Sequence, residues 1–302
     1  SRHQNWLQLR PGEIMNCGGC HDPVNGTSHG RFDAFNILNT GAPFDGYVFP
    51  NTETFFADTG DTMAEARTRI DPTSQEPTVD IHYQDVWTDE TASGRMKDGA
   101  FDYNYTDLDP GMTAPVSVAC QSNWDTLCRI VINYQDHIHP LWNVTRDVGG
   151  VDKTCNSCHN NKDGAGADME PAGQLDLSDG VSDINPDHFK SYRELLSGDD
   201  AEILDTSGTL IKQQAVDPVT GTPLFALDAN GDPDPLQPIF VRAPGPSMRV
   251  AGAIASSRFF SRFENPGDAD HFGTLSGAEL KLIAEWLDIG GQYYNNPFDV
   301  PP

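Results

Sequence analysis

The stretch Cys155-Asn156-Ser157-Cys158-His159 decides how this chain folds, and Cys17-Gly18-Gly19-Cys20-His21 repeats its pattern. Two cysteines separated by two residues can each form a thioether to one vinyl group of a porphyrin. The histidine that follows them then lies under the iron, as in c-type haem. The sequence therefore predicts two covalent haem c groups, attached through Cys17, Cys20, Cys155 and Cys158, with His21 and His159 as proximal ligands.

Zinc is the alternative use of a C-x-x-C pair. A structural zinc ion needs four ligands, so each pair would need a second pair of cysteines or histidines at suitable spacing. The two remaining cysteines, Cys120 and Cys128, lack that spacing. The two motifs therefore favour haem over zinc.

Cys120 and Cys128 enclose a short loop and are predicted to form a disulfide. Thioether attachment in bacteria takes place outside the cytoplasmic membrane, so both uses of cysteine indicate a periplasmic or extracellular protein. No apolar run approaches the ~20 residues of a membrane span. The chain begins at Ser1 with a polar segment and no signal peptide, so we expect a mature product or the C-terminal piece of a longer protein.

The composition predicts much irregular structure. Only 37% of the 302 residues are hydrophobic, and 28 glycines and 22 prolines favour loops and turns. Because each porphyrin supplies an apolar core, we predict a mainly α fold with much irregular loop structure, a few short strands and two cytochrome-c-like haem modules. Residues 1–118 would form the first module, with a long loop-rich insertion. Residues 119–302 would form the second, which ends in a capped C-terminal helix.

Three segments carry local secondary-structure signals. A capping box at Ser276 and Glu279 predicts a helix that is stopped by two glycines after residue 289. Asn185-Pro186 predicts the start of another helix, which would run to residue 198. Alternation over residues 79–83 predicts a strand with residues 79, 81 and 83 facing inward and His82 on the polar face.

The net charge disfavours nucleic acid and anionic membranes as partners. The chain has 19 basic and 45 acidic residues, and its net charge is −26. Such a surface repels nucleic acid and anionic membranes. The expected partners are redox proteins or further copies of the chain itself, with no nucleic acid and no membrane span.

The order of several segments resembles a family. These are Pro11-Gly12-Glu13 before the first haem motif, His137-Ile-His-Pro-Leu-Trp142 before the second, and Glu285-Trp-Leu-Asp-Ile-Gly-Gly291 near the end. Together they resemble the C-terminal, haem-carrying part of multidomain bacterial cytochromes related to the alpha subunit of hydrazine synthase. The resemblance spans nearly the whole chain and implies a dihaem cytochrome.

One departure from that family concerns the chemistry of the first haem. In hydrazine synthase a tyrosine just after the motif's histidine ligates the catalytic haem. Here residues 22–29 contain no tyrosine, and the first one is Tyr47. Ordinary ligation by His21 is therefore the better expectation.

The resemblance also implies a sixth ligand for the second haem. The family pattern places a histidine just before the closing helix, which here is His271. Met248 is the competitor, because His/Met ligation is also common in c-type haem proteins.

The sixth ligand of the first haem stays open. His29 lies eight residues after His21 and can reach around a haem edge. His137 is the main rival, because Pro140 biases His139 away from a helical conformation. The further alternatives are His139, His3 and His188. His3 could instead reach the iron of a neighbouring copy and link copies into a chain.

A calcium loop is a further hypothesis. Oxygen-bearing side chains occupy alternate positions at Asp228, Asn230, Asp232 and Asp234, as they do in calcium-binding loops. The glutamate that completes an EF-hand is missing, because Ile239 stands in its place. A hydrated acidic turn is the alternative.

These patterns predict a secreted dihaem c-type cytochrome that transfers electrons, within a larger complex or as a polymeric chain of haems. The alternative is a haem enzyme subunit, hydrazine-synthase-like or peroxidase-like, with one open iron. The ample supply of histidine, nine in all, favours two six-coordinate irons and hence the electron carrier.

Overall fold

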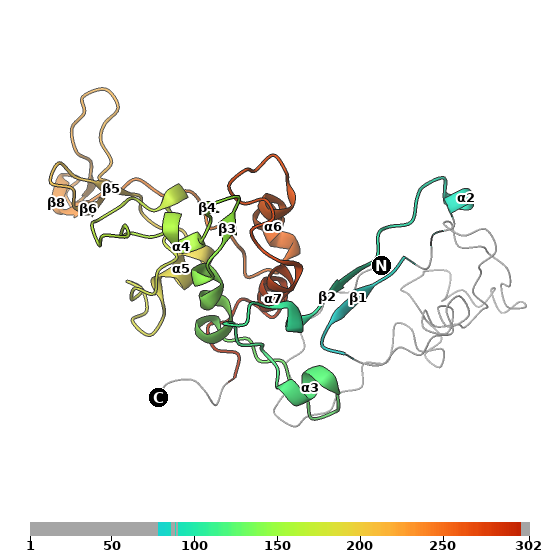
Figure 1. Ribbon diagram of the computed structural model, residues 1–302. Coiled ribbons are helices and arrows are strands. Elements are labelled where there is room, and N and C mark those ends of the chain that lie inside the picture. Colours follow the sequence, from blue (N-terminus) through green and yellow to red (C-terminus); the bar gives the residue numbers. More distant parts are fainter. Residues whose placement is uncertain (1–77, 86–87, 89, 297–302) are drawn as a thin grey trace, which may run out of the picture. The chain divides into compact units, whose positions relative to one another are not determined.

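The computed structural model describes residues 78–85, 88 and 90–296 (Figure 1). Contacts divide the chain into two compact units. The described part of the first is contained in residues 82–101, and that of the second comprises 78–81 and 102–296. The first haem motif and the predicted ligands His3, His21 and His29 lie outside the described residues. The predicted boundary between haem modules near residue 118 therefore stays a prediction, although residues 102–118 belong to the second unit.

A small sheet includes part of the strand predicted for residues 79–83. Strands β1 (Ile81–Tyr83) and β2 (Phe101–Tyr103) pair, and the rings of Tyr83 and Phe101 stack with centroids 4.8 Å apart. A short helix, α2 (Glu90–Ser93), lies between them in the sequence. Val79 is buried as predicted, but Ile81 and Tyr83 are exposed. The predicted inward face was wrong for these two residues. Within the part of the chain that the structure describes, their strand pairs with β2 alone.

The core of the second unit is organised by α7 (Gly277–Asp288). Its predicted capping box is present: the Ser276 hydroxyl accepts the Glu279 amide, and the Glu279 carboxylate accepts the Ser276 amide. The helix buries its apolar face completely at Leu282, Ile283, Trp286 and Leu287. It is followed by two glycines with positive φ, 102° at Gly290 and 60° at Gly291. Local signals thus define this helix at both ends.

An aromatic cluster packs on α7. Tyr134 is fully buried, and its ring centroid lies 5.5 Å from that of Trp286 and 5.6 Å from that of Tyr293. The Trp142 indole donates a 3.1 Å hydrogen bond to the Tyr134 hydroxyl. The segment that carries Tyr134 is a π-helix, η5 (Tyr134–Ile138), followed directly by a 3₁₀ helix, η6 (His139–Asn143).

The helix predicted from residue 186 begins later, as α5 (Lys190–Leu196). Asn185 does not act as its N-cap. Its side-chain oxygen accepts the Asp187 amide and its carbonyl accepts the His188 amide, so residues 185–188 form a turn. Competition of this kind between an asparagine side chain and helix formation explains the four-residue shift.

The remaining elements of the second unit are short. They are η4 (Tyr105–Asp107), α3 (Val118–Ser122), β3 (Asp147–Val148), β4 (Val151–Asp152), α4 (Cys155–Cys158), η7 (Ala172–Gln174), η8 (Ile254–Ser256) and α6 (Ser257–Glu264). Residues 202–238 add β5 (Glu202–Leu204), β6 (Leu210–Lys212), β7 (Phe225–Leu227) and β8 (Pro233–Pro238). In the described residues β3–β4, β5–β6 and β7–β8 are separate antiparallel pairs. The β5–β8 hairpins lie at one end of this unit, beyond α4 and α5 from α7 (Figure 1).

The hairpin turns share one design, an aspartate followed three residues later by glycine. Asp205 Oδ1 accepts the amides of Ser207 and Thr209, and Gly208 adopts a φ of +80°. Asp228 and Gly231 repeat the arrangement, with a φ of +88° at the glycine. The aspartate satisfies the turn's amides and the glycine adopts the left-handed conformation that the turn requires.

The structure contains the predicted disulfide. Cys120 and Cys128 are joined, with Cα atoms 5.7 Å apart, and α3 lies at the start of the loop that they close. Short helices, short strands and long loops make up the described residues. A cytochrome-like arrangement of modules stays a prediction. None of the helices in residues 78–85 and 90–296 is long and apolar enough to cross a membrane.

Candidate haem site

One helical turn carries the second haem motif. Helix α4 spans Cys155–Cys158, and the His159 amide donates to the Cys155 carbonyl at 2.9 Å. Both cysteines are free thiols; Cys158 is exposed and Cys155 is half-buried. The turn leaves both thiols available for the thioether bonds that the motif predicts.

The ring of His271 lies beside the ring of His159. Their centroids are 6.1 Å apart and their planes are inclined by 35°. Two imidazoles that bind one metal ion on opposite sides have centroids about 6.3 Å apart, since each nitrogen lies about 2.0 Å from the metal. The two residues come from segments far apart in the sequence, and their spacing fits an iron with two axial histidines.

Asp268 orients the His271 ring. Its Oδ1 lies 2.8 Å from Nδ1 of His271, and this hydrogen bond is the main cause that lowers the pKa of the Asp268 carboxyl. Arg262 lies 3.4 Å from the other oxygen of the same carboxylate. When Nδ1 donates its proton to a carboxylate, the lone pair of Nε2 is left for a metal. The Asp268 carboxylate thus fixes the orientation of the His271 ring, as a supporting residue of an axial ligand would.

His159 is held in the neutral form. Burial is the largest influence on its pKa and lowers it, and the nearby His271 lowers it further. The carbonyl groups of Ala172 and Leu175 lie against the ring and oppose this shift, although Nδ1 is buried without a hydrogen bond. A neutral imidazole is the form that binds iron.

His137 has the opposite arrangement. Its Nδ1 lies 3.1 Å from the Asn133 amide, which donates to it, and 3.3 Å from the Asn133 carbonyl oxygen. The Asn133 amide can donate to Nδ1 only when this nitrogen carries no proton. The proton then lies on Nε2, and His137 is not prepared to bind a metal through that atom.

His139 is also helical and buried. Its φ and ψ are −57° and −39°, so the extended conformation predicted from Pro140 was wrong. Proline is accommodated because it stands at the first turn of η6, where its missing amide is not needed. Nε2 of His139 is buried without a hydrogen bond, and the ring lies 4.7 Å from that of Phe189. Whether His29, His137, His139, His3 or His188 serves the first haem stays a prediction.

Met248 belongs to the apolar core. It is fully buried, and its amide donates to the Leu195 carbonyl at 2.9 Å. The ring of His271, in contrast, lies beside that of His159, with centroids 6.1 Å apart. The geometry therefore favours His271 over Met248 as the sixth ligand of the second haem.

The calcium hypothesis finds no support in the turn that carries it. Asp228 Oδ1 accepts the amides of Asn230 and Asp232, and Asp234 Oδ1 accepts the Leu236 amide. These carboxylates satisfy their own loop. Over residues 78–85, 88 and 90–296 no group of three or more His, Cys, Asp or Glu side chains could hold a metal ion. Calcium at Asp228, Asn230, Asp232 and Asp234 stays an unsupported prediction.

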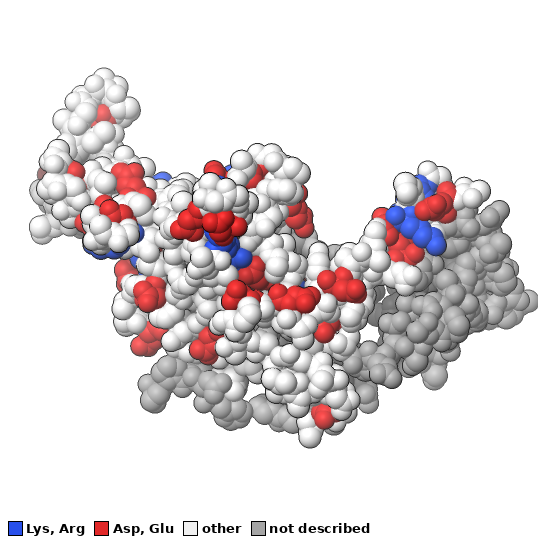
Figure 2. Space-filling model, in the orientation of Figure 1, with Lys and Arg blue, Asp and Glu red and all other residues white. Residues whose placement is uncertain are grey.

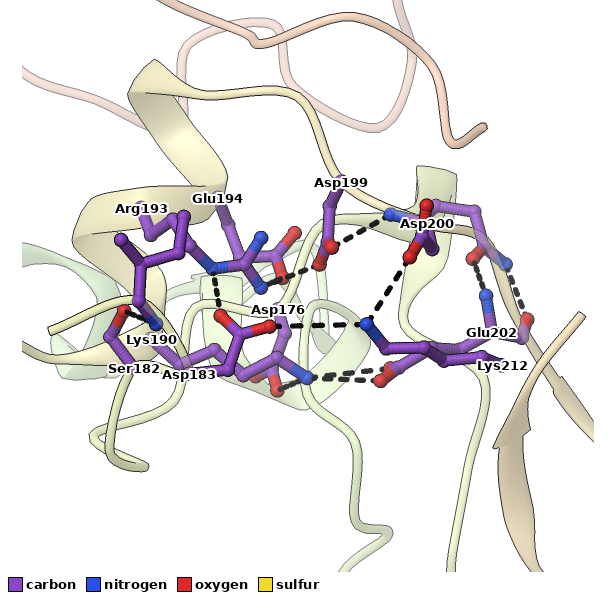
Figure 3. Close-up of polar contacts among 12 residues, drawn as sticks. Asp176, Ser182, Asp183, Lys190, Arg193, Glu194, Asp199, Asp200, Glu202 and Lys212 are labelled. Carbon is purple, nitrogen blue, oxygen red and sulfur yellow. Dashed lines mark hydrogen bonds and ion pairs between the residues drawn. The ribbon is translucent and has the colours of Figure 1, made fainter. Parts of the chain in front are cut away.

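A network of ion pairs includes residues of α5 and of the segments on either side of it in the sequence (Figure 3). Its acidic members are Asp176, Asp183, Glu194, Asp199, Asp200 and Glu202, and its basic members are Lys190, Arg193, Lys212 and Arg242. Gln174 joins the network to η7: its side-chain amide donates to the Glu202 carbonyl and its side-chain oxygen accepts the Glu202 amide. Gln174 and Leu175 also line a small cavity with Glu194 and Asp199.

The network contains one carboxyl with a strongly raised pKa. Burial, above all, raises the pKa of Glu194 to about 8, and a hydrogen bond with Asp199 adds to this effect. The pKa of Asp199 is lowered to about 2, because hydrogen bonds from Arg193 and Glu194 outweigh its partial burial. At neutral pH the two acids therefore carry largely one negative charge, beside Arg193.

Sequence reasoning missed two residues, Asp268 and Arg146, that bond to the segments carrying His159 and His271. Asp268 stands three residues before His271, a spacing that could have indicated its role. Arg146 could not be found in this way, because its partner Glu279 lies 133 positions away.

Comparison with known proteins finds no match: no family model, curated protein or solved structure matches this chain. The resemblance to hydrazine synthase-related cytochromes therefore rests on the motifs themselves.

Proposed function

We propose that this chain is a secreted dihaem c-type cytochrome that transfers electrons. The observation that carries the proposal is the pair of His159 and His271, whose ring centroids lie 6.1 Å apart. His159 directly follows the two cysteines of an attachment motif. Cys155 and Cys158 would hold the porphyrin, and the two histidines would take the axial positions. Bound haem supplies a one-electron iron couple.

The axial pair favours a carrier over a catalyst at the second haem. Two imidazoles, one supported by Asp268, would occupy both axial positions and leave none for a substrate. The first haem motif is outside the described residues, so its function as a second carrier follows from the sequence alone.

The disulfide supports a compartment outside the cytoplasm. Cys120 and Cys128 are joined, and structural disulfides persist in oxidising compartments. We propose a periplasmic or extracellular location. Acidic side chains outnumber basic ones on the visible face (Figure 2), which favours a redox partner with a basic docking surface or, through specific contacts, a second copy.

The test uses the chain purified from a host that attaches c-type haem. Mass spectrometry of the denatured protein should show two added haems, and the ferric protein should give low-spin spectra. Carbon monoxide should bind the reduced second haem slowly or not at all. A chain that accumulates without covalent haem would refute the proposal, and rapid stoichiometric binding of carbon monoxide at either haem would favour an enzyme.

A further inference from the structure

The backbone of Arg146 is tied to the start of the haem motif. Its carbonyl accepts the Lys153 amide at 2.7 Å, and its amide donates to Oγ1 of Thr154 at 3.1 Å. Lys153 and Thr154 directly precede Cys155. Any displacement of Arg146 would therefore move the attachment cysteine.

The side chain of Arg146 reaches the other axial segment. It forms a two-pronged ion pair with Glu279, at 2.7 and 3.0 Å, and both side chains are more than nine-tenths buried. The guanidinium also donates to the Thr274 carbonyl at 2.6 Å and to the Leu141 carbonyl at 3.1 Å. The Thr274 amide and hydroxyl in turn bond to the His271 carbonyl at 3.0 and 2.8 Å.

The remaining donor of Arg146 is buried as well. Among the described residues, Nε has no hydrogen-bond partner. The Cys155 side chain is close enough to the guanidinium to interact with it. The guanidinium therefore contacts Cys155 of the attachment motif as well as Thr274 and Glu279.

We infer that Arg146 is a positioning residue for the second haem, which holds the Cys155–His159 turn and the His271–Glu279 segment at one separation. The inference rests on the proposed function, since it assigns the residue that sets the distance between the two axial histidines. A lysine cannot replace it, because only the guanidinium fork can bond two carboxylate oxygens and two carbonyls together.

The first test compares Arg146→Lys with the wild-type holoprotein by electron paramagnetic resonance, well below the unfolding temperature. The low-spin signal of one of the two haems should shift or be replaced by a high-spin signal. Arg193→Lys is the matched control. Arg193 is equally buried and pairs with Asp183, Glu194 and Asp199, none of which belongs to the Cys155–His159 turn or to the His271–Glu279 segment. Its replacement should lower stability and leave both low-spin signals unchanged.

The second test uses the charge of the pair. Arg146→Met leaves the Glu279 carboxylate unpaired, which should lower the midpoint potential of one haem by stabilising ferric iron. Glu279→Gln leaves the guanidinium unpaired and should raise that potential. A loss of packing alone would not give shifts of opposite sign. If Arg146→Met does not fold, Arg146→Lys and Glu279→Gln still decide the question.

The outcomes separate the inference from the proposed function. A wild-type chain without covalent haem would refute the function. A wild-type chain with two low-spin haems, whose signals and potentials stay unchanged in Arg146→Lys and Glu279→Gln, would overturn the inference alone.

Discussion

Nδ1 of His271 lies 2.8 Å from Oδ1 of Asp268, and this contact selects the tautomer in which Nε2 is free. A carboxylate partner makes the imidazole a stronger electron donor and stabilises ferric iron. Asp268→Asn should therefore raise the midpoint potential of one haem. We expect a tenfold change in the one-electron equilibrium, which corresponds to about 59 mV. Redox titration measures this shift. Asp228→Asn, in the turn between β7 and β8, is the control and should change neither potential.

Removal of His271 should open the second iron. His271→Ala is expected to convert one haem from low-spin to high-spin and to allow rapid carbon monoxide binding at that haem. Optical and resonance spectra measure both effects. His82→Ala is the control, because His82 is exposed on strand β1 and is not among the predicted ligands. A low-spin spectrum that survives in His271→Ala would assign the sixth position to Met248 or to another histidine.

Glu194 should make stability depend on pH. Its pKa is raised from 4.5 to about 8 in the folded state, so the folded chain binds more protons than the unfolded chain between these values. The free energy of unfolding should fall as the pH rises through this window, by at most about 1.4 kcal/mol per pH unit, and level off above pH 8. The lowered pKa of Asp199 has the opposite effect, but below pH 4.

Denaturant unfolding between pH 5 and 8 tests this prediction. Glu194→Gln should reduce the fall in stability relative to the wild type. Glu202→Gln is the matched control, because it removes a neighbouring carboxylate of the same network and leaves Glu194 in place. Equal pH profiles for the wild type and Glu194→Gln would contradict the assignment.

A buried lysine offers a fourth prediction. The Lys281 ammonium lies 3.3 Å from the centroid of the Tyr105 ring and 3.0 Å from a Glu285 oxygen, and its side chain is fully buried. Burial lowers the pKa of Lys281. Glu285→Gln removes its partner and should cost about 1–3 kcal/mol of stability. Lys281→Met removes the buried charge itself and should cost less. The reverse order in denaturant titrations would show that the ion pair is not what stabilises Lys281.

Short sequence patterns predicted correctly those structural features that depend on residues close together in the chain. The capping box at Ser276 and the glycines after Ile289 define α7, and both act over a few residues. The disulfide followed from counting cysteines. The strand at residue 81 and the helix at residue 186 were predicted less well, because the exposure of one face and the turn at Asn185 override simple periodicity.

The site was predictable only as separate residues. His159 and His271 could be named from motifs, but neither motif predicts the 6.1 Å between their rings or the bonds of Arg146 to Thr274 and Glu279, which come from a distant part of the chain. The tautomer of His137 depends on the π-turn after Asn133, for which the sequence carries no signal. Such relations arise from tertiary packing, which no short pattern encodes.

The sequence separation of 112 between His159 and His271 gives their pairing a consequence for the unfolded chain. A shared iron would act as a cross-link that closes this long loop, whereas the disulfide closes a loop with a sequence separation of 8. By lowering the conformational entropy of the unfolded chain, the disulfide would raise the free energy of unfolding by about 2.5 kcal/mol. A cross-link over 112 residues would raise it by about 4.8 kcal/mol. A loop-rich chain with a modest apolar core would thus gain more stability against thermal unfolding from an axial iron–histidine bond than from its disulfide.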